Sequence, residues 1–451
     1  MEEINGKSAL IVGYGREGQS VHRFLLAHHP NLKIGIADIA KIKPIDKNVD
    51  LHLGKDYLED IEKYDVLIRS PGISSSLPQL KNFTKAGKIV TSATNIFFSI
   101  SPGVIVGVTG TKGKSTTSSL IADVLASELN DVRLVGNIGR PALDYLKGAD
   151  RKTIFVCELS SQQLEDLRYS PHVAVVHVIY PEHLDSHKTF GQYLSAKSNI
   201  VKFQETGDFV IFNAGNTNSS KLGQMSLAKK IPFASDEKYK GLCFIRGDSV
   251  FLKEDHRKKH ILERSDIPLL GPGNIENVLA VVCVASLFKI SSAKIKQIVK
   301  KFKSLPHRLE FVANVNGIKF YNDSQATNPM AVINALEGLS PDVGTLIIGG
   351  YDRGLDLTQL GKYIALQNIQ NLILFPTTGE KIWSIIASAK IKGRSFRKFK
   401  ANSMQEAVDI AFANTPKGKT CLLSPGAASF GLFKNYEERG NLFREFVLSK
   451  K

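Results

Sequence analysis

The segment GTKGKST, residues 110 to 116, has the residue types and spacing of a phosphate-binding loop. Its glycines allow backbone N–H groups to turn toward an anion, and a helix that begins after the loop adds a partial positive charge. Lys114 can reach the outer phosphates of a nucleotide, and the hydroxyl of Ser115 or Thr116 can hold Mg²⁺. We therefore interpret the segment as an ATP-binding loop.

The flanking sequence supports this interpretation. Residues 104 to 108 are apolar and mostly β-branched, as expected of a buried parallel strand. After the loop, apolar residues recur at helical spacing, at Leu120, Ile121, Val124 and Leu125. The usual pattern has glycine five positions before Gly113, where this chain has Val108, so we expect a shorter variant of the loop. The alternative is a glycine-rich turn with a lysine in solvent.

A second glycine motif lies near the N-terminus. It follows an apolar run at residues 8 to 14 and has GxGxxG spacing, with Gly13, Gly15 and Gly18. A second apolar run at 32 to 38 ends at Asp38, twenty residues after the last of these glycines. By itself, this pattern predicts a βαβ unit that binds a dinucleotide.

Apolar runs that end in polar loops continue along the chain and predict a multidomain α/β protein. The expected strands, several with the loops that follow them, lie within 65–73, 88–92, 133–139, 153–161, 172–180, 208–214, 315–328, 343–354, 371–376 and 419–429. Residues 216 to 268 resemble short surface β-structure, GPGNIENVLAVVCVASLFKI predicts a buried helix, and residues 434 to 450 predict an amphipathic closing helix. Natural boundaries fall near Ser101 and Ser304.

Composition is that of a globular protein of about three domains, since the chain has 451 residues and is 43% hydrophobic. We expect a cytoplasmic protein, because the N-terminus lacks a signal-peptide pattern and no run of about 18 apolar residues predicts a membrane span. The cysteines are scattered and are expected to be reduced packing residues: Cys157, Cys243, Cys283 and Cys421.

The chain is basic, with a net charge of +16. Such a charge suits nucleic acid, an acidic membrane surface or small anionic substrates. The lysines are thinly spread, and the clusters at 253–260 and 294–303 are interpreted as solvated faces. We therefore favour small anionic substrates and expect neither nucleic acid nor a membrane as partner.

Several polar residues follow predicted strands, where ligands gather in open α/β sheets. Glu158 is a candidate metal ligand, with capping or ion pairing as the alternative, and His183 and Asp185 occupy the next such loop. Lys197, in FGQYLSAKSNIVKF, has the pattern of an ordinary helix-surface lysine. Other candidates have simpler structural explanations as helix caps, salt-bridge partners or loop residues: Asn274, Asn277, Arg308, Asp323, Ser324 and Thr327.

Together and in this order, these segments resemble the Mur ligase family along nearly the whole chain. The resemblance is carried by GTKGKST, GNIG (136–139), ELSS (158–161), EHLD (182–185), Lys197, GNIEN (273–277), LPHRLE (305–310), NDSQATNP (322–329), GGYDRG (349–354) and SPGAASFGLFKNYEERG (424–440). The last segment, with GYGREG and SPGI near the N-terminus, favours the members that add D-glutamate to UDP-N-acetylmuramoyl-L-alanine.

The resemblance implies three α/β domains and changes the interpretation of the N-terminal glycines. It implies a Rossmann-like UDP-substrate domain at 1–101, a central P-loop ATPase-type parallel sheet at 102–304 and a Rossmann-like amino-acid-binding domain at 305–451. UDP and the muramoyl peptide would then contact Gly13, Tyr14, Gly15, Arg16, Asp38, Ser70, Gly72, Asn137 and Ser160. NAD remains an alternative, although a hydride-transferring enzyme has no use for Lys114 and Ser115.

The resemblance also implies a complete ligase site. ATP would contact Gly110, Thr111, Lys112, Gly113, Lys114, Ser115, Thr116, Asn274, Arg308 and Asp323. Two Mg²⁺ ions would be organised by Ser115 or Thr116, Glu158, His183 and Lys197, which corresponds to the family's carbamylated lysine. The catalytic residues would be Lys114, Glu158, His183 and Lys197, and D-glutamate would contact Thr327, Arg353, Ser429, Phe430 and Tyr436.

Some positions depart from the family pattern. Lys112 replaces an asparagine, Glu182 an aspartate, and Gln325 and Arg353 each a lysine; Gln162 and Tyr436 also differ from common residues. Arg353 can still hold a carboxylate bidentately. Because glutamine is neutral, Gln325 would not supply the positive charge that lysine places near the nucleotide or acyl phosphate. The extra cation at Lys112 would offset this loss.

The activity implied is ATP-dependent amide formation through an acyl phosphate, in the synthesis of peptidoglycan precursors by a monomer. The expected substrates are ATP, UDP-N-acetylmuramoyl-L-alanine and D-glutamate. Two alternatives stay open. One is another Mur-type or a folylpolyglutamate-type ligase, and the other is a non-catalytic nucleotide-binding paralogue in which Gln325 and Glu182 have weakened the chemistry.

Overall fold

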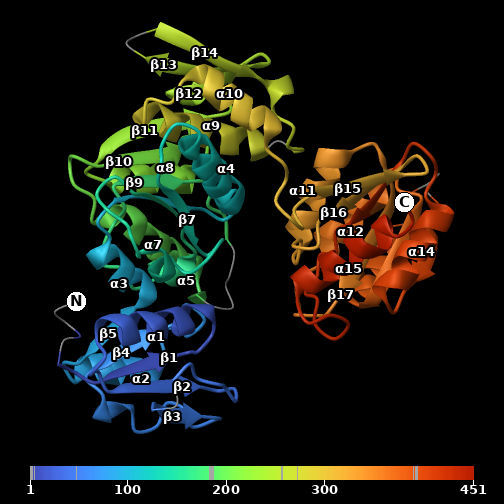
Figure 1. Cartoon of the computed structure of the whole chain (residues 1–451). Coiled ribbons are helices and arrows are strands. Elements are labelled where there is room, and N and C mark those ends of the chain that lie inside the picture. Colours follow the sequence, from blue (N-terminus) through green and yellow to red (C-terminus); the bar gives the residue numbers. More distant parts are fainter. Residues whose placement is uncertain are drawn as a thin grey trace. The chain divides into compact units, whose positions relative to one another are not determined.

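The computed structural model describes residues 4, 6–46, 48–181, 187–254, 257–271, 273–389, 391 and 395–451. The chain divides into two compact units, Met1–Ile267 with Ile275–Lys301, and Pro268–Asn274 with Phe302–Lys451. Two β-sheets lie in the first unit and one in the second (Figure 1). The predicted α/β fold with three sheets is confirmed.

The N-terminal sheet has five parallel strands in the order β3-β2-β1-β4-β5. The strands are β1 (Ala9–Val12), β2 (Ile34–Asp38), β3 (Asp50–Leu53), β4 (Val66–Arg69) and β5 (Ile89–Ser92), and the helices are α1 (Arg16–His28), α2 (Pro78–Lys85) and α3 (Ala93–Ile100). Every residue of β1 and β4 is buried, as expected of parallel strands covered on both faces. Because β1 and β4 are neighbours, the loops after them lie side by side.

The central sheet has nine strands in the order β14-β13-β12-β11-β10-β9-β6-β8-β7. They are β6 (Val104–Thr109), β7 (Val132–Gly136), β8 (Ile154–Glu158), β9 (Val173–Val176), β10 (Phe209–Asn213), β11 (Lys229–Ala234), β12 (Cys243–Arg246), β13 (Ser249–Glu254) and β14 (Arg257–Glu263). The strands from β6 to β12 pair in parallel, whereas β12, β13 and β14 pair antiparallel. The strands expected to be parallel do pair in parallel, and the antiparallel edge lies within residues 216–268, where short surface β-structure was expected. A tight turn containing Gly247 (φ +57°) joins β12 to β13.

Helices surround the central strands. They are α4 (Lys114–Ala126), α5 (Ser161–Leu164), α7 (Phe190–Lys202), α8 (Thr217–Met225), α9 (Gly273–Leu287) and α10 (Ser292–Lys301), with a short 3₁₀ helix η2 (Ala142–Tyr145). The predicted buried helix is α9, whose residues 277 to 285 are all buried. The stretch from 216 to 268 contains the predicted short strands and also α8, which the sequence pattern did not indicate.

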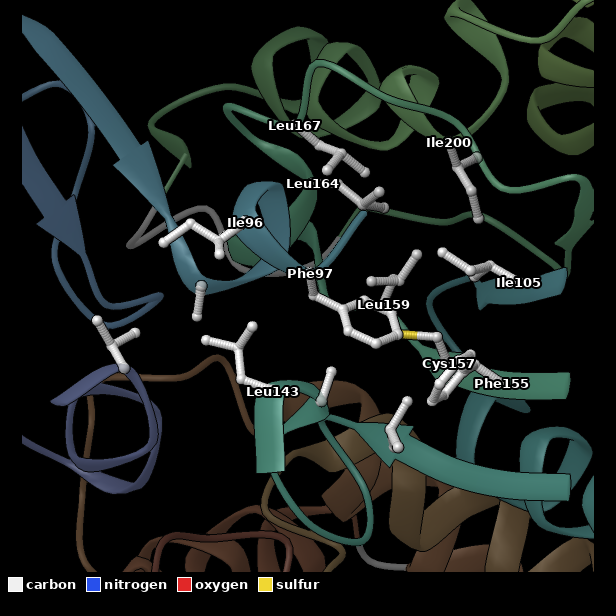
Figure 2. Close-up of a cluster of buried hydrophobic side chains, with 14 of the residues drawn as sticks. Ile96, Phe97, Ile105, Leu143, Phe155, Cys157, Leu159, Leu164, Leu167 and Ile200 are labelled. Carbon is white, nitrogen blue, oxygen red and sulfur yellow. The ribbon is translucent and has the colours of Figure 1, made fainter. Parts of the chain in front are cut away.

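The two sheets of the first unit share one hydrophobic core. Phe97 of α3 lies among side chains of the central sheet, and its ring meets that of Phe155 edge-on with centroids 5.1 Å apart (Figure 2). The same cluster includes Ile11 of β1 and Cys157 of β8. This shared core explains why residues of both sheets belong to one compact unit.

The C-terminal sheet has six strands in the order β15-β16-β20-β17-β18-β19, all parallel except the β15–β16 pair. The strands are β15 (Glu310–Val315), β16 (Ile318–Asn322), β17 (Val343–Gly350), β18 (Asn371–Thr377), β19 (Arg397–Lys400) and β20 (Thr420–Leu423). The helices are α11 (Pro329–Leu339), α12 (Thr358–Leu366), α13 (Thr378–Ser388), α14 (Met404–Asn414) and α15 (Tyr436–Leu448), the predicted closing helix.

Two further expectations can be compared with the structure. All four cysteines are free and buried, as predicted. In the part of the chain that the structure describes, no helix is both long and apolar enough to cross a membrane.

Candidate functional site

The loop between β6 and α4 has the shape that the glycine pattern predicted. Gly110 has φ +156° and Gly113 has φ +85°, conformations that residues with a side chain rarely adopt. A Cβ on Gly110 would lie 2.6 Å from Cβ of His177, and one on Gly113 would lie 2.4 Å from Oδ1 of Asn277. Both positions therefore require glycine, and α4 begins directly after them at Lys114.

Thr111 ties this loop to the segment after β9. Its N–H donates to the carbonyl oxygen of Val178 at 2.8 Å, and its hydroxyl donates to that of Tyr180 at 3.0 Å. The Thr111 hydroxyl oxygen also accepts from the Tyr180 N–H at 3.0 Å and lies 2.9 Å from the hydroxyl of Tyr193 on α7. The loop is thus fixed in place from two elements.

Lys197 is buried beneath the loop, with 1% of its surface exposed. Its Nζ donates to the carbonyl oxygen of Gly110 at 2.9 Å and to Oγ1 of Thr109 at 3.1 Å. The expectation of an ordinary surface lysine was wrong, because Lys197 lies on the inner face of α7. Tyr193 and Ile200, at helical spacing from it, are also buried and could have indicated this face.

His177, after β9, supports the same loop from below and was not identified from the sequence. Thr117 donates to Oδ1 of Asn277 at 3.2 Å, so its oxygen accepts a hydrogen bond from Nε2 of His177 at 2.8 Å. Burial, and to a smaller extent the nearby charge of Lys114, lower the pKa of His177 to about 3. The ring is therefore neutral, and it adds no charge beside the loop.

Glu158 fits a cation site. It ends β8, is 1% exposed, and its Oε1 accepts a hydrogen bond from Nδ2 of Asn137 at 2.9 Å. Its buried Oε2 has no hydrogen-bond partner among the described residues. A buried carboxylate oxygen without a partner is costly, and a bound cation would compensate it.

The other predicted metal ligands are only partly described. Ser115 is buried in the first turn of α4, and Thr116 beside it is half-buried. His183 and its neighbour Glu182 lie outside the described residues. Among the residues that are described, no group of three or more His, Cys, Asp and Glu side chains could hold a metal ion.

The predicted UDP-contacting residues meet at the carboxyl ends of β1, β2 and β4. Gly13 has φ +89°, and Ser70 donates from its hydroxyl to the Gly13 carbonyl oxygen at 2.7 Å. The two carboxylate oxygens of Asp38 accept from the N–H groups of Tyr14, at 2.7 Å, and Ala40, at 2.8 Å. These bonds place the loops at 13–16 and 70–72 and Asp38 in one constellation.

The predicted muramoyl-peptide residues lie across from that constellation in the same unit. Arg16 donates to the carbonyl oxygen of Gly139, next to the segment that carries Asn137. Ser160 caps α5 and forms a capping box with Gln163, whose side chain donates to Glu17 at 3.2 Å. The structure therefore connects both predicted parts of the UDP-substrate site.

In the second unit, the predicted nucleotide residue Asp323 joins three segments. Its Oδ1 accepts from the N–H of Leu309 at 3.2 Å, and its Oδ2 accepts from the hydroxyl of Ser424 at 2.8 Å. Leu309 directly follows Arg308, so Asp323 fixes the segment before β15 that carries this predicted contact. Asn274 donates from Nδ2 to the Leu270 carbonyl oxygen at 2.6 Å, a local bond near the start of α9.

The predicted acceptor residues surround the loops after β17 and β20. The Arg353 guanidinium lies over the ring of Phe430, 5.3 Å from its centroid. Tyr351, which the sequence did not single out, meets Phe430 edge-on at 6.0 Å, and its N–H donates to Ala428 at 2.9 Å. Ser429 is buried beside them, and these residues form one group.

Two other predicted acceptor residues are placed by the neighbouring loop. Tyr436 begins α15, and its carbonyl oxygen accepts from the hydroxyl of Ser324 at 2.8 Å. Thr327 is half-buried three residues along the same loop. Nothing in the described contacts joins Thr327 or Tyr436 to Arg353 directly.

Arg439 of α15 was missed by the sequence reasoning and is fully buried. It donates to the carbonyl oxygen of Ser324 at 2.7 Å, to the Ser324 hydroxyl at 3.0 Å and to the Ala427 carbonyl oxygen at 3.2 Å. Burial lowers the pKa of this guanidinium to about 10. It connects the loops after β16 and β20, which hold the predicted nucleotide and acceptor residues.

Comparisons with known proteins cover the whole chain. Three family profiles match in order: "Mur ligase MurD-like, N-terminal domain" at residues 7–92, "Mur ligase middle domain" at 108–285, and "Mur ligase, glutamate ligase domain" at 307–426. A Koribacter versatilis protein named UDP-N-acetylmuramoylalanine--D-glutamate ligase is 34% identical over 99% of this chain and 98% of its own. The chain belongs to the Mur ligase family.

Other Mur ligases give the same result. A protein of the same name from Lachnoclostridium phytofermentans is 32% identical over 98% of both chains. Solved structures share the fold at low identity. MurF from Acinetobacter baumannii has a TM-score of 0.63 at 15% identity, covering 98% of this chain and 90% of its own, and MurC from Thermotoga maritima has 0.61 at 16%, covering 99% and 100%. The resemblance inferred from the sequence is confirmed.

The geometry of this Mur ligase is suited to phosphoryl transfer. In the first unit, a rigid glycine loop, two lysines and a buried carboxylate oxygen lie at the carboxyl edge of the central sheet, next to the residues at 137–139 and 160. In the second unit, the Arg353 guanidinium and the half-exposed rings of Tyr351 and Phe430 lie beside the loop of small residues at 424–429.

Proposed function

We propose that this Mur ligase joins D-glutamate to UDP-N-acetylmuramoyl-L-alanine at the expense of ATP. The observation that carries the proposal is the contact between Asn137 and Glu158. It links a predicted substrate residue to the buried carboxylate beside the phosphate loop, with Nδ2 and Oε1 2.9 Å apart. Full-length relatives that bear the name of this ligase support the choice of substrates.

The reaction has two steps. The carboxylate of the L-alanyl group attacks the γ-phosphorus of ATP, which forms an acyl phosphate and releases ADP. The amine of D-glutamate then attacks the acyl carbon, phosphate leaves, the nitrogen loses a proton, and an amide remains. The chain contributes position and charge, because the N–H groups of residues 110–113 and the Lys114 ammonium hold the phosphates in line with the carboxylate.

Mg²⁺ would be held by Glu158, by Ser115 or Thr116, by His183 and by Lys197. The unpartnered Oε2 of Glu158 is the feature that fits a cation. When bound, Mg²⁺ would neutralise the charge that the phosphate oxygens carry. Lys197 would need to be carbamylated for this purpose, because an ammonium group repels a cation, whereas a carbamate is a carboxylate-like ligand.

The UDP moiety would lie on the loops at the ends of β1, β2 and β4. Its diphosphate would face Gly13, Tyr14, Gly15 and Arg16, with Asp38, Ser70 and Gly72 around it. Asn137 and Ser160 would face the muramoyl peptide. In this proposal residues 1–101 bind the UDP substrate, residues 102–304 bind ATP, and residues 305–451 bind the amino acid.

The acceptor would be held by Arg353, whose planar guanidinium can bind a carboxylate bidentately. Thr327, Ser429, Phe430 and Tyr436 would complete the pocket. Asn274, Arg308 and Asp323 would contact the nucleotide, together with Thr111 and Lys112 of the phosphate loop. We further propose that the enzyme works as a monomer in the cytoplasm, where its nucleotide substrates are made.

The proposal is tested by measuring phosphate release with ATP, Mg²⁺ and UDP-N-acetylmuramoyl-L-alanine in the presence of different amino acids. Release that requires D-glutamate supports it. Activity with L-lysine or diaminopimelate on a longer nucleotide precursor would indicate a different Mur ligase, and glutamate addition to folate would indicate a folylpolyglutamate-type ligase. Nucleotide binding without release would indicate a non-catalytic paralogue.

A further inference from the structure

Arg69, the last residue of β4, is buried between the two sheets of the first unit. Only 1% of its surface is exposed. It directly precedes the turn at residues 70 to 72 but is not among the predicted substrate residues. A buried guanidinium is retained only where its hydrogen bonds and charge are satisfied, so its partners show what it holds together.

On one side, Arg69 closes the turn that follows it. Its Nη1 donates to the carbonyl oxygen of Ile73 at 2.5 Å, and the N–H of Ile73 donates to the Ser70 carbonyl oxygen at 3.0 Å. Ser70 in turn donates from its hydroxyl to Gly13 at 2.7 Å. The guanidinium therefore fixes the turn that contacts the first glycine loop.

On the other side, Arg69 holds the α5 segment of the central sheet. Its Nη2 donates to the Gln162 carbonyl oxygen at 3.0 Å, and its Nε donates to Oδ2 of Asp166 at 3.1 Å. Nη2 also lies 3.0 Å from Oδ1 of Asp166, and Nη1 lies 3.6 Å from Oε2 of Glu165. One cation thus faces two carboxylates, and a single side chain connects the 70–73 turn to α5.

The α5 segment lies close in sequence to the proposed substrate and metal-binding residues. Gln162 is two residues from Ser160 and four from Glu158. Asn95, in the first turn of α3 just after β5, strengthens the same junction by donating from Nδ2 to the Asp166 carbonyl oxygen at 3.0 Å. The shared apolar core around Phe97 lies on the same junction (Figure 2).

We propose that Arg69 is a positioning residue that sets the spacing between the UDP-binding loops and the residues that face the muramoyl peptide. This inference rests on the proposed function. One substrate spans both places, so its two ends behave as linked ligands, and a fixed spacing raises the effective concentration of the second end once the first has bound. The same spacing places the L-alanyl carboxylate relative to the phosphate loop.

A second arginine provides a matched control. Arg23 of α1 also crosses between the two sheets, where it forms an ion pair with Asp144 at 2.8 Å. It contacts neither the 70–73 turn nor α5, and 46% of its side-chain surface is exposed. If any arginine bridge between the sheets sufficed, Arg23→Ala and Arg69→Ala would have the same effect.

The test separates the two sides of the junction with Asp166→Ala, which removes a partner in the turn just after α5 and leaves the bond from Arg69 to Ile73. Binding of UDP alone and of UDP-N-acetylmuramoyl-L-alanine is measured by calorimetry on the full chain. In Asp166→Ala we expect UDP affinity within about twofold of the unmodified protein and affinity for the complete substrate about tenfold weaker. Arg69→Ala should weaken the binding of UDP and of the complete substrate and should also lower kcat. Arg23→Ala should change neither of these affinities and should leave kcat unchanged.

Several outcomes would overturn the inference. One is full-substrate affinity in Arg69→Ala and Asp166→Ala equal to that of the unmodified protein. Another is an equal loss of UDP and full-substrate affinity in Asp166→Ala, since this would mean that the pair only stabilises the turn. Arg69→Lys keeps the charge but cannot reach both segments, so it should also lose affinity for the complete substrate. This variant replaces Arg69→Ala in the test if Arg69→Ala does not fold. Failure of the unmodified protein to bind the complete substrate would reject the proposed function itself, before any variant is made.

Discussion

Lys114 and Lys197 donate hydrogen bonds to the same oxygen, the carbonyl of Gly110, each over 2.9 Å. Lys114 is the first residue of α4, whereas Lys197 approaches from α7. The two lysines do not have equal freedom, because Lys197 is buried and Lys114 is only partly buried. Lys114 can therefore turn toward a phosphate, while Lys197 stays beneath the loop.

The first prediction concerns Lys197. Carbamylation would replace its ammonium donor with carboxylate-like oxygens, so the bond to Gly110 would be lost and an acidic ligand would face the loop. We expect Lys197→Ala to lower the rate of phosphate release by about a hundredfold or more. We also expect protein kept in ¹³C-bicarbonate to show a carbamate signal by NMR that is missing in Lys197→Ala.

Lys202 is the control for this experiment. It lies on the same helix, but it is exposed, and Lys202→Ala should retain both the signal and the activity. A carbamate signal that persists in Lys197→Ala would assign the modification elsewhere. No signal at all, together with full activity in Lys197→Ala, would remove the proposed modification and metal ligand.

The second prediction concerns the unpartnered oxygen of Glu158. Glu158→Gln keeps an acceptor for Asn137 and removes a buried negative charge. In the absence of Mg²⁺, we expect the thermal unfolding midpoint to stay the same or rise, because a neutral amide costs less to bury than a carboxylate. The increase in that midpoint on addition of ATP and Mg²⁺ should be lost, and so should phosphate release. A variant that kept the Mg²⁺-dependent increase would show that Glu158 is not a ligand.

The parts of the fold that could be predicted are those that short stretches of sequence determine. Buried parallel strands such as Val104–Thr109 and Ile154–Glu158 are continuous apolar runs, and they were located from this pattern. The phosphate loop was located because its glycines have conformations that other residues rarely adopt. Both signals lie within a few residues.

What could not be predicted depends on distant parts of the chain. Arg69 is satisfied by residues 162 to 166, and Arg439 by Ser324 and Ala427, so neither pairing is visible in a local window. His177 looked like part of an apolar strand, and its contact with Thr117 requires the folded sheet. The β12–β13 pair is antiparallel because a tight turn containing Gly247 joins the two strands, and the lysine-rich sequence around it did not indicate this pairing.

The third prediction follows from the pKa of His177, which burial and Lys114 lower to about 3 from 6.5. Between these two values the unfolded chain binds a proton that the folded protein does not, so stability falls as the pH falls through this window. The slope from this one group is at most about 1.4 kcal/mol per pH unit.

The measurement is the thermal unfolding midpoint at about pH 7.5, 6.5 and 5.5 for the unmodified protein and for His177→Asn. As the pH falls, the unfolding midpoint of His177→Asn should decline less steeply than that of the unmodified protein. His22 and His307, whose pKa values are also lowered by burial, contribute equally to both proteins. Identical declines would contradict a neutral, buried His177.

The fourth prediction concerns acceptor binding. Arg353→Ala should raise the KM for D-glutamate by about tenfold or more, because a charge-assisted bidentate contact is lost, and should leave the KM for ATP nearly unchanged. Arg353→Lys should raise the KM for D-glutamate by a smaller factor than Arg353→Ala does. Arg397 offers a control of matched geometry, since it lies 5.3 Å from the centroid of Phe399 in the same unit. Equal effects of Arg353→Ala and Arg397→Ala would show that the acceptor binds elsewhere.

In the proposed reaction, phosphoryl transfer activates the substrate carboxylate, and the amine of D-glutamate then attacks the acyl phosphate. This reaction is tested most directly by supplying UDP-N-acetylmuramoyl-L-alanine labelled with ¹⁸O in its L-alanyl carboxylate, with ATP and Mg²⁺, and analysing the released phosphate by mass spectrometry. We expect each phosphate to carry one oxygen from that carboxylate, and we expect its release to require D-glutamate, for which L-glutamate does not substitute. Phosphate without the label, or release that is indifferent to D-glutamate, would contradict the proposed reaction.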